Sequence, residues 1–179
     1  IPLFIDGARL GFGLAAEGND VALEDIARLS DVFYIGGTKV GALFGEAVVI
    51  TNPDILKHFV PLVKQHGALL AKGRLLGIQF DTLFTDSLYL EITKGAVKKA
   101  LQIREAFANR GINFFGASTS NQQFPILTDK QIDFLSKNSL PEFWCNADGG
   151  KKVVRFCTSW ATTDKAVETL ISDIANMPE

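Results

Sequence analysis

The chain has 179 residues, of which 47% are hydrophobic and 21% are charged, and its formal net charge at pH 7 is −2. This composition excludes an intrinsically disordered chain, and the lack of a long basic run leaves no electrostatic case for nucleic-acid binding. No apolar stretch approaches the roughly 18 residues that a membrane-spanning helix needs, so no membrane partner is expected.

The first part of the chain predicts strands that alternate with a helix. Residues 1–5 are apolar throughout, which is typical of a buried parallel strand. A helix is expected over 21–29, because apolar residues recur there at helical spacing and acids lie early, where the helix dipole favours them. Further strands are expected at 32–35 and 46–51, and this order predicts a layered α/β sheet. Because natural chains seldom begin inside a core strand, we expect the sequence to be the C-terminal part of a longer protein.

The region 55–83 predicts an interface. Two helical segments, 55–63 and 68–83, carry apolar residues over much of their circumference. A helix that is apolar nearly all round is buried on several sides. We therefore expect this region to lie between domains or between the subunits of a homo-oligomer, either a dimer or a tetramer.

The second half predicts a small α+β domain behind a long amphipathic helix. That helix is expected over 86–110, and it ends before Gly111, where a left-handed cap belongs. The remaining strands are expected at 112–115, 123–127, 142–145 and 152–157, and the remaining helices at 129–137 and 163–177. The chain is thus expected to comprise two domains, 1–85 and 86–179.

The cysteines and histidines show no metal-binding pattern. Cys145 and Cys157 lie in strand-like runs and are expected to be reduced, buried thiols of a cytoplasmic protein. His58 and His66 are eight residues apart with no second pair, so we expect no metal site.

Two short segments carry the residues with chemical potential, Asp-Gly-Ala-Arg at 6–9 and Tyr-Ile-Gly-Gly-Thr-Lys at 34–39. The amine of Lys39, on a tight turn bounded by glycines, can hold an aldehyde cofactor as a Schiff base. Asp6 ends an apolar run, and a buried carboxylate is costly unless a cation meets it. The protonated ring nitrogen of pyridoxal 5′-phosphate (PLP) is such a cation. Each residue alone could be an ordinary loop or turn residue, but the pair predicts a PLP site.

Neighbouring residues could complete that site. Arg9 is placed to meet the cofactor or the carboxylate of Asp6, although an ordinary ion pair is an equal alternative. Thr38 could offer its hydroxyl to the phosphate or to the imine, or it could serve only the turn.

An amino-acid substrate has a carboxylate, which an arginine fork binds well. The candidates are Arg74, Arg104, Arg110 and Arg155. Arg155 lies among apolar neighbours in 153–157, so its charge needs a partner, either a substrate carboxylate or a structural salt bridge. Arg74 could face the cofactor phosphate or a neighbouring subunit.

These motifs carry a resemblance to a known family. The segments at 6–9 and 34–39, together with Val-Arg-Phe-Cys-Thr-Ser-Trp-Ala-Thr at 154–162, resemble the threonine aldolase and β-eliminating lyase family of fold-type I PLP enzymes. The closest resemblance is to low-specificity L-threonine aldolase-like proteins. It implies an α/β fold, the remainder of an aspartate aminotransferase-type PLP-binding large domain in 1–85, followed by a small C-terminal α+β domain in 86–179.

The resemblance also implies roles. Lys39 would be the Schiff-base lysine, Asp6 the partner of the ring nitrogen, Arg9 a neighbour of the ring hydroxyl, and Arg155 the group that binds the substrate carboxylate. The implied reaction is retro-aldol cleavage of L-threonine or L-allo-threonine to glycine and an aldehyde, in a homotetramer with sites at subunit interfaces. The family's phosphate-binding loop and ring-stacking histidine are absent from the chain, and Thr38 stands where serine is common. The chain alone is therefore expected to hold PLP weakly.

Two alternatives remain open from the sequence. One is a PLP-dependent β-eliminating lyase that acts on an aromatic amino acid. The other is a non-catalytic, degenerate subunit of the same fold.

Overall fold

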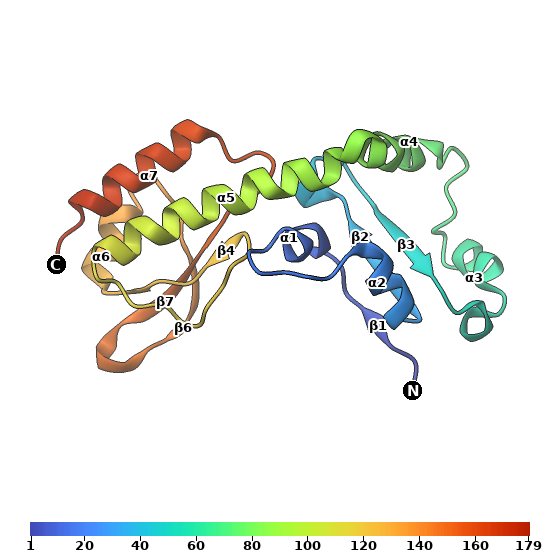
Figure 1. Cartoon of the computed structure of the whole chain (residues 1–179), viewed down its shortest axis with the longest axis horizontal. Coiled ribbons are helices and arrows are strands. Elements are labelled where there is room, and N and C mark those ends of the chain that lie inside the picture. The colour runs from blue at the N-terminus through green and yellow to red at the C-terminus, as the bar shows by residue number, and fades with distance from the viewer. The chain divides into compact units, whose positions relative to one another are not determined.

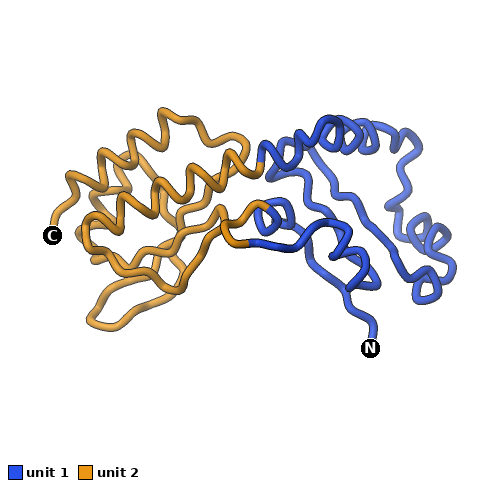
Figure 2. Tube along the Cα trace, in the orientation of Figure 1, with its two compact units in different colours: residues 1–14, 19–92 blue, residues 15–18, 93–179 orange.

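The chain divides into two units, coloured blue and orange in Figure 2. A computed structural model describes all residues from 1 to 179. Unit 1 comprises residues 1–14 and 19–92, and unit 2 comprises residues 15–18 and 93–179. None of the helices combines the length and the hydrophobicity needed to cross a bilayer.

A three-stranded sheet forms the centre of unit 1 (Figure 1). The central strand β2 (Val32–Gly36) pairs in parallel with β1 (Phe4–Ile5) and in antiparallel with β3 (Glu46–Ile50). Asp31 joins one end of the sheet, because its carboxylate accepts the Leu3 amide at 2.7 Å and the Asn52 side-chain amide at 2.7 Å.

The helices of unit 1 are short. They are α1 (Leu10–Leu14), α2 (Leu23–Leu29), α3 (Phe59–Gln65) and α4 (Arg74–Phe84), with 3₁₀ turns η1 (Thr38–Val40), η2 (Pro53–Leu56) and η3 (Thr85–Ser87). The single helix expected over 55–63 is divided, because the left-handed backbone of His58 (φ 62°) separates η2 from α3. The helix expected over 68–83 begins six residues late, at Arg74.

Unit 1 leaves much apolar surface in solvent. Residues 1–5 were expected to be buried, yet Phe4 is 58% exposed, because β1 has only two residues and a sheet neighbour on one side alone. The segment 55–84 was expected to be buried on several sides, but nine of its large apolar side chains are exposed within this chain (Ile55, Phe59, Val60, Leu62, Leu69, Leu70, Leu75, Ile78 and Phe84). Large exposed apolar patches mark interaction surfaces.

Unit 2 is an antiparallel sheet covered by helices. Strand β7 (Lys152–Cys157) is central and pairs with β4 (Gln122–Gln123), β5 (Ile126–Leu127) and β6 (Glu142–Asn146). The helices are α5 (Leu88–Asn109), most of which belongs to unit 2, α6 (Asp129–Leu135) and α7 (Asp164–Asn176), with a 3₁₀ turn η4 (Asp148–Gly150). As expected, Gly111, two residues after the end of the long helix, has a left-handed backbone (φ 68°).

The core of unit 2 lies between α5, α6 and α7 and one face of the sheet (Figure 1). Alternate side chains of a strand point to the same face of a sheet, and Val154 and Phe156 of β7 therefore both join this core. The buried cluster consists of Ile103, Phe107, Leu127, Leu135, Val154, Phe156, Val167, Leu170, Ile174 and Met177. Neither cysteine forms a disulfide bond, and both lie outside this cluster. Cys145 is half-buried and Cys157 is exposed, so the expectation that both are buried is wrong; each lies near a strand end.

Candidate active site

The segment 6–9 is held against the end of β2 by close backbone contacts. The Gly36 amide donates a hydrogen bond to the Gly7 carbonyl at 2.9 Å. A Cβ atom on Gly7 would lie 1.6 Å from the Tyr34 carbonyl oxygen, and one on Gly36 would lie 2.4 Å from the Ala8 carbonyl oxygen. Only glycine permits such an approach. The two motifs singled out in the sequence therefore meet at the carboxyl ends of the parallel strands β1 and β2.

Asp6 lies at this edge as an exposed, ionised carboxylate. Its Oδ1 atom accepts a hydrogen bond from the Tyr34 hydroxyl and another from the Ala8 amide at 3.1 Å. The bond from Tyr34, followed by the bond from Ala8 and the positive charge of Lys39, lowers the pKa of Asp6 below its usual 3.8. The prediction that Asp6 is buried is wrong, because solvent reaches the residue beyond the short strand β1.

Lys39 lies in the turn η1 that follows β2. The turn is closed by amides of Val40 and Ala42, which donate to the Gly37 carbonyl at 2.9 and 3.0 Å, and it ends at Gly41 in the left-handed region (φ 106°). The side chain of Lys39 is half-buried, and its amine forms no hydrogen bond or salt bridge with the chain. The Lys39 amine therefore lies near enough to Asp6 to influence its pKa, but it is not engaged in a hydrogen bond or salt bridge.

The other predicted residues are distributed over both units. Arg9 is half-buried and immediately precedes α1, and Thr38 is exposed beside Lys39. Asp6, Arg9, Thr38 and Lys39 therefore belong to the same two adjoining segments of unit 1. Arg155 belongs to β7 in unit 2.

Arg155 already has partners within unit 2. Its Nη2 atom forms an ion pair with Glu142, and its Nη1 atom donates to Gln122 Oε1 at 3.0 Å. The guanidinium carbon lies 5.6 Å from the centre of the Trp144 ring, and the Nε atom is buried without a hydrogen-bond partner. The structural salt bridge considered from the sequence is thus present in this structure.

The remaining arginine candidates are less suited to a substrate. Arg104 donates to Gln123 Oε1 at 3.2 Å and stacks over the Phe114 ring at 4.1 Å. Arg110 donates to three carbonyls at the end of α7. Arg74 is exposed at the start of α4.

Sequence reasoning missed two tyrosines that organise this edge. Tyr34 bonds to Asp6, as described above. Tyr89 is buried, donates to the Gly36 carbonyl at 3.0 Å and accepts the Gly11 amide at 3.2 Å. Burial raises the pKa of Tyr89 to about 12. The only available signal was the expected parallel pairing of the first two strands. Pairing alone does not predict that Ile5 lies opposite Phe33 and so places Asp6 beside Tyr34.

Gln79 holds the loop that follows the lysine turn. Its Oε1 atom accepts the Leu43 amide at 2.6 Å, and its Nε2 atom donates to the Phe44 carbonyl at 3.2 Å. A side chain of α4 therefore supports the segment that leads from Lys39 into β3.

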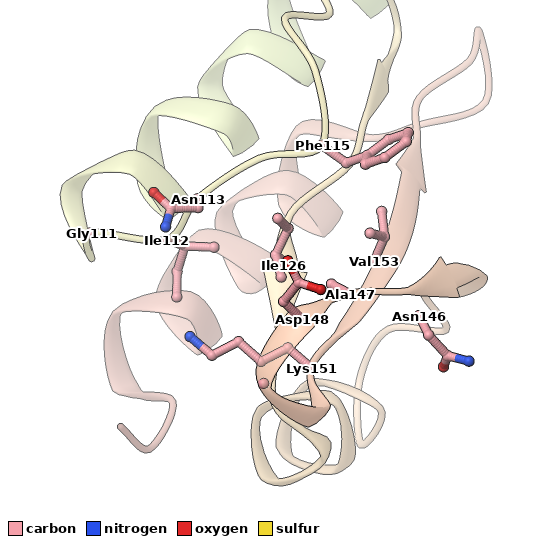
Figure 3. Close-up of a pocket in the computed structure, with 11 residues that line it drawn as sticks. Gly111, Ile112, Asn113, Phe115, Ile126, Asn146, Ala147, Asp148, Lys151 and Val153 are labelled. Carbon is pink, nitrogen blue, oxygen red and sulfur yellow. The ribbon is translucent and has the colours of Figure 1, made fainter.

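The hollow drawn in Figure 3 lies within unit 2 and has a volume of about 650 Å³. Asp148 and Lys151 are its only charged side chains. Its lining consists of Gly111, Ile112, Asn113, Phe115, Ile126, Asn146, Ala147, Asp148, Gly149, Lys151 and Val153. None of the predicted site residues is among them, so this hollow is not the candidate site.

The residues at the edge of unit 1 fit PLP at two of its groups. An aldehyde needs an amine without a competing partner, which Lys39 supplies. A protonated ring nitrogen needs an ionised acceptor, and the Oδ2 atom of Asp6 has no hydrogen-bond partner in the chain. The described residues contain no cluster of three or more acidic, histidine or cysteine side chains that could hold a metal.

Comparison with known proteins relates the chain to threonine aldolases. No family model matches it. The low specificity L-threonine aldolase of Pseudomonas aeruginosa is 30% identical over 173 residues, and that of a Pseudomonas species is 28% identical. Each alignment covers 96% of this chain but 49% of the relative, so the chain spans about half the length of the curated relatives it matches.

Solved structures agree with this relation. The threonine aldolase of Leishmania major matches with a TM-score of 0.94 and 41% identity, over 98% of this chain and 52% of that one. Serine palmitoyltransferase of Sphingomonas wittichii matches with a TM-score of 0.66 at 16% identity, which shows a shared fold; the alignment covers 98% of this chain and 48% of the other. The predicted resemblance to threonine aldolases and the predicted fold-type I class are both confirmed.

Proposed function

We propose that the protein containing this chain is a PLP-dependent threonine aldolase that cleaves L-threonine or L-allo-threonine to glycine and an aldehyde. One observation carries the proposal. The free amine of Lys39 and the ionised carboxylate of Asp6 lie at the adjacent ends of two parallel strands. The similarity to threonine aldolases over 96% of the chain supports the choice of reaction.

When bound, PLP supplies an electron-accepting ring that stabilises negative charge at the substrate α carbon. Lys39 would attach the cofactor through its amine, which must be neutral when it attacks. Asp6 would accept a hydrogen bond from the ring nitrogen and so hold a proton on that atom. Thr38 and Arg9, from the same two segments, would bind the phosphate and the ring hydroxyl.

Arg155 would bind the substrate carboxylate. Its Nη2 atom is engaged by Glu142, which is 60% exposed, whereas the side chain of Arg155 is only 18% exposed. An incoming carboxylate would therefore replace an exposed acid at a mostly buried guanidinium. This exchange keeps the buried charge paired, since an unpaired buried charge is strongly unfavourable.

The assembly and the domain organisation belong to the same proposal. Residues 1–85 would be part of the PLP-binding large domain, and residues 86–179 would form the small C-terminal domain. The exposed apolar side chains of 55–84 support a homo-oligomer, a dimer or tetramer, in which another subunit covers them. We place the enzyme in the cytoplasm, as expected for a chain whose two cysteines form no disulfide bond.

The deciding experiment compares the intact protein with its Lys39→Ala variant. We expect the wild type to acquire visible absorbance on addition of PLP and to release acetaldehyde from L-threonine or L-allo-threonine. Lys39→Ala should lose the absorbance and at least about 10²-fold in activity. Lys98→Ala is the matched control, because Lys98 is an exposed lysine of α5.

Other outcomes would point to the alternatives. Release of indole or phenol from an aromatic amino acid, without acetaldehyde from threonine, would favour a β-eliminating lyase. A wild type that shows no absorbance with PLP would favour a degenerate subunit.

A further inference from the structure

Tyr34 lies at the edge of the sheet that carries Asp6 and Lys39, but the proposed PLP chemistry assigns it no role. It lies in β2, one residue beyond the Phe33–Ile5 pair of the parallel register, so it is the direct neighbour of Asp6 on the adjacent strand. Its ring packs against Phe4, with 6.0 Å between the ring centres. Its hydroxyl donates to Asp6 Oδ1. The phenol of Tyr34 thus bonds to the Asp6 carboxylate from β2, the strand that leads into the lysine turn.

The two oxygens of Asp6 have different surroundings. Oδ1 accepts both the Tyr34 hydroxyl and the Ala8 amide. Oδ2 has no donor within the chain. Because an ionised carboxylate offers about two acceptor positions on each oxygen, the two donors occupy Oδ1 and leave Oδ2 available. The carboxylate is thereby fixed at one end and open at the other.

We propose that Tyr34 is the positioning residue of Asp6, holding Oδ1 so that Oδ2 is presented to the ring nitrogen of PLP. This inference rests on the proposed function. Tyr34 acts through Asp6 and does not touch the cofactor. It also favours the ionised carboxylate, because a donor bonded to the charged form stabilises that form.

The surroundings of Asp6 and Tyr34 shift the pKa values of the two residues in opposite directions. The bond to Tyr34 is the main cause of the lowered pKa of Asp6, and the positive charge of Lys39 contributes in the same direction. The same bond, together with desolvation and the negative charges of Asp6 and Glu46, raises the pKa of Tyr34 to about 12. Tyr34 therefore remains a hydroxyl donor over the whole range in which the enzyme would work.

The test is PLP affinity of the intact protein as a function of pH, measured by titrating the visible absorbance. We expect Tyr34→Phe to weaken PLP binding by roughly 10- to 150-fold, the range for a hydrogen bond to a charged group. As the pH is lowered, PLP affinity should begin to fall at a higher pH in Tyr34→Phe than in the wild type, since Asp6 without this donor becomes protonated more easily. We call this fall in affinity at low pH the acid limb. A merely structural role of Tyr34 would not move the acid limb.

Tyr89→Phe is the matched control, because Tyr89 is the other tyrosine of the chain and its hydroxyl bonds to the backbone of Gly36 and Gly11 and not to Asp6. It should lower thermal stability without moving the acid limb. In an Asp6→Asn background, Tyr34→Phe should cause little further loss of affinity, because both changes act on one interaction.

A measurement without substitution guards against misfolding of the variant. Carboxyl NMR of the apoprotein should show Asp6 titrating below its usual value of 3.8. An unmoved acid limb in Tyr34→Phe, or fully additive losses with Asp6→Asn, would overturn the positioning role while leaving the aldolase proposal intact. A wild type that does not bind PLP would overturn both.

Discussion

Units 1 and 2 differ in how completely each buries its own apolar side chains. Unit 2 encloses a cluster in which Phe107, Leu127, Leu135 and Ile174 are fully buried. Unit 1 carries the candidate active site but leaves side chains such as Leu43 and Leu75 largely in solvent. The comparison shows that the hydrophobic content of the sequence alone does not say where a core lies. The apolar side chains of unit 2 form a core, whereas many of those in unit 1 lie on the surface.

Phe107→Ala should cause the greatest loss of stability. Phe107 is 0% exposed, and its ring lies 5.3 Å from that of Phe156 and 6.4 Å from that of Phe114, so truncation leaves a cavity in the core of unit 2. We expect a loss of about 3–5 kcal/mol in the free energy of unfolding, measured by denaturant titration. Leu75→Ala, at a side chain 58% exposed in unit 1, should cost under about 1 kcal/mol when the protein is monomeric. Equal losses for the two variants would contradict the difference between the units.

Arg110→Ala should come next, because it removes a cap from the last helix of unit 2. The guanidinium donates to the carbonyls of Ile174, Ala175 and Met177 at 2.6–2.9 Å, where α7 leaves acceptors unpaired. A loss of about 1.5–3 kcal/mol in the free energy of unfolding is expected. Arg28→Ala, which removes the exposed ion pair with Asp25 in unit 1, should change it by under about 0.5 kcal/mol. A similar loss from both arginines would show that the cap of α7 is unimportant.

Alkaline titration examines unit 1 alone, because both tyrosines of the chain belong to it. The pKa of Tyr34 and that of Tyr89 are each raised from 10.0 to about 12, the first chiefly by the bond to Asp6 and the second by burial. The folded state therefore binds more protons than the unfolded state between pH 10 and pH 12. Their contribution to stability is complete below pH 10 and is lost as the pH rises through about 12.

Tyrosinate absorbance provides the measurement. The difference spectra between the wild type and Tyr34→Phe, and between the wild type and Tyr89→Phe, isolate the two hydroxyls. Each should titrate near pH 12. A Tyr34 hydroxyl that titrates near pH 10 would contradict its bond to Asp6.

The sequence predicted regular elements better than their contacts. Strand β7 was predicted with its observed bounds, and the β2 strand and the closing helix within about one residue, because their apolar periodicity is strong. Residues 68–73 were predicted to be helical from hydrophobicity, which cannot distinguish an exposed apolar loop from a buried helix. The meeting of the segments 6–9 and 34–39 follows from parallel strands. The bond between Tyr34 and Asp6 depends on the register of β1 against β2, which cannot be predicted from the local sequence of either strand.

Glu142→Gln should have a small effect on stability and the most specific effect on function. Glu142 is 60% exposed, and in the variant the glutamine side-chain oxygen and Gln122 Oε1 can still accept hydrogen bonds from Arg155. The loss of the ion pair should therefore change the free energy of unfolding by under about 1 kcal/mol. If a substrate carboxylate replaces Glu142 at Arg155, the variant removes a competitor, and KM for threonine should fall several-fold with kcat little changed. Asp129→Asn is the matched control, because it neutralises the acid that pairs with Lys152 of the same strand at 2.7 Å. A KM that responds equally to both substitutions, or to neither, would argue that Arg155 serves the sheet of unit 2 and that the substrate carboxylate binds elsewhere.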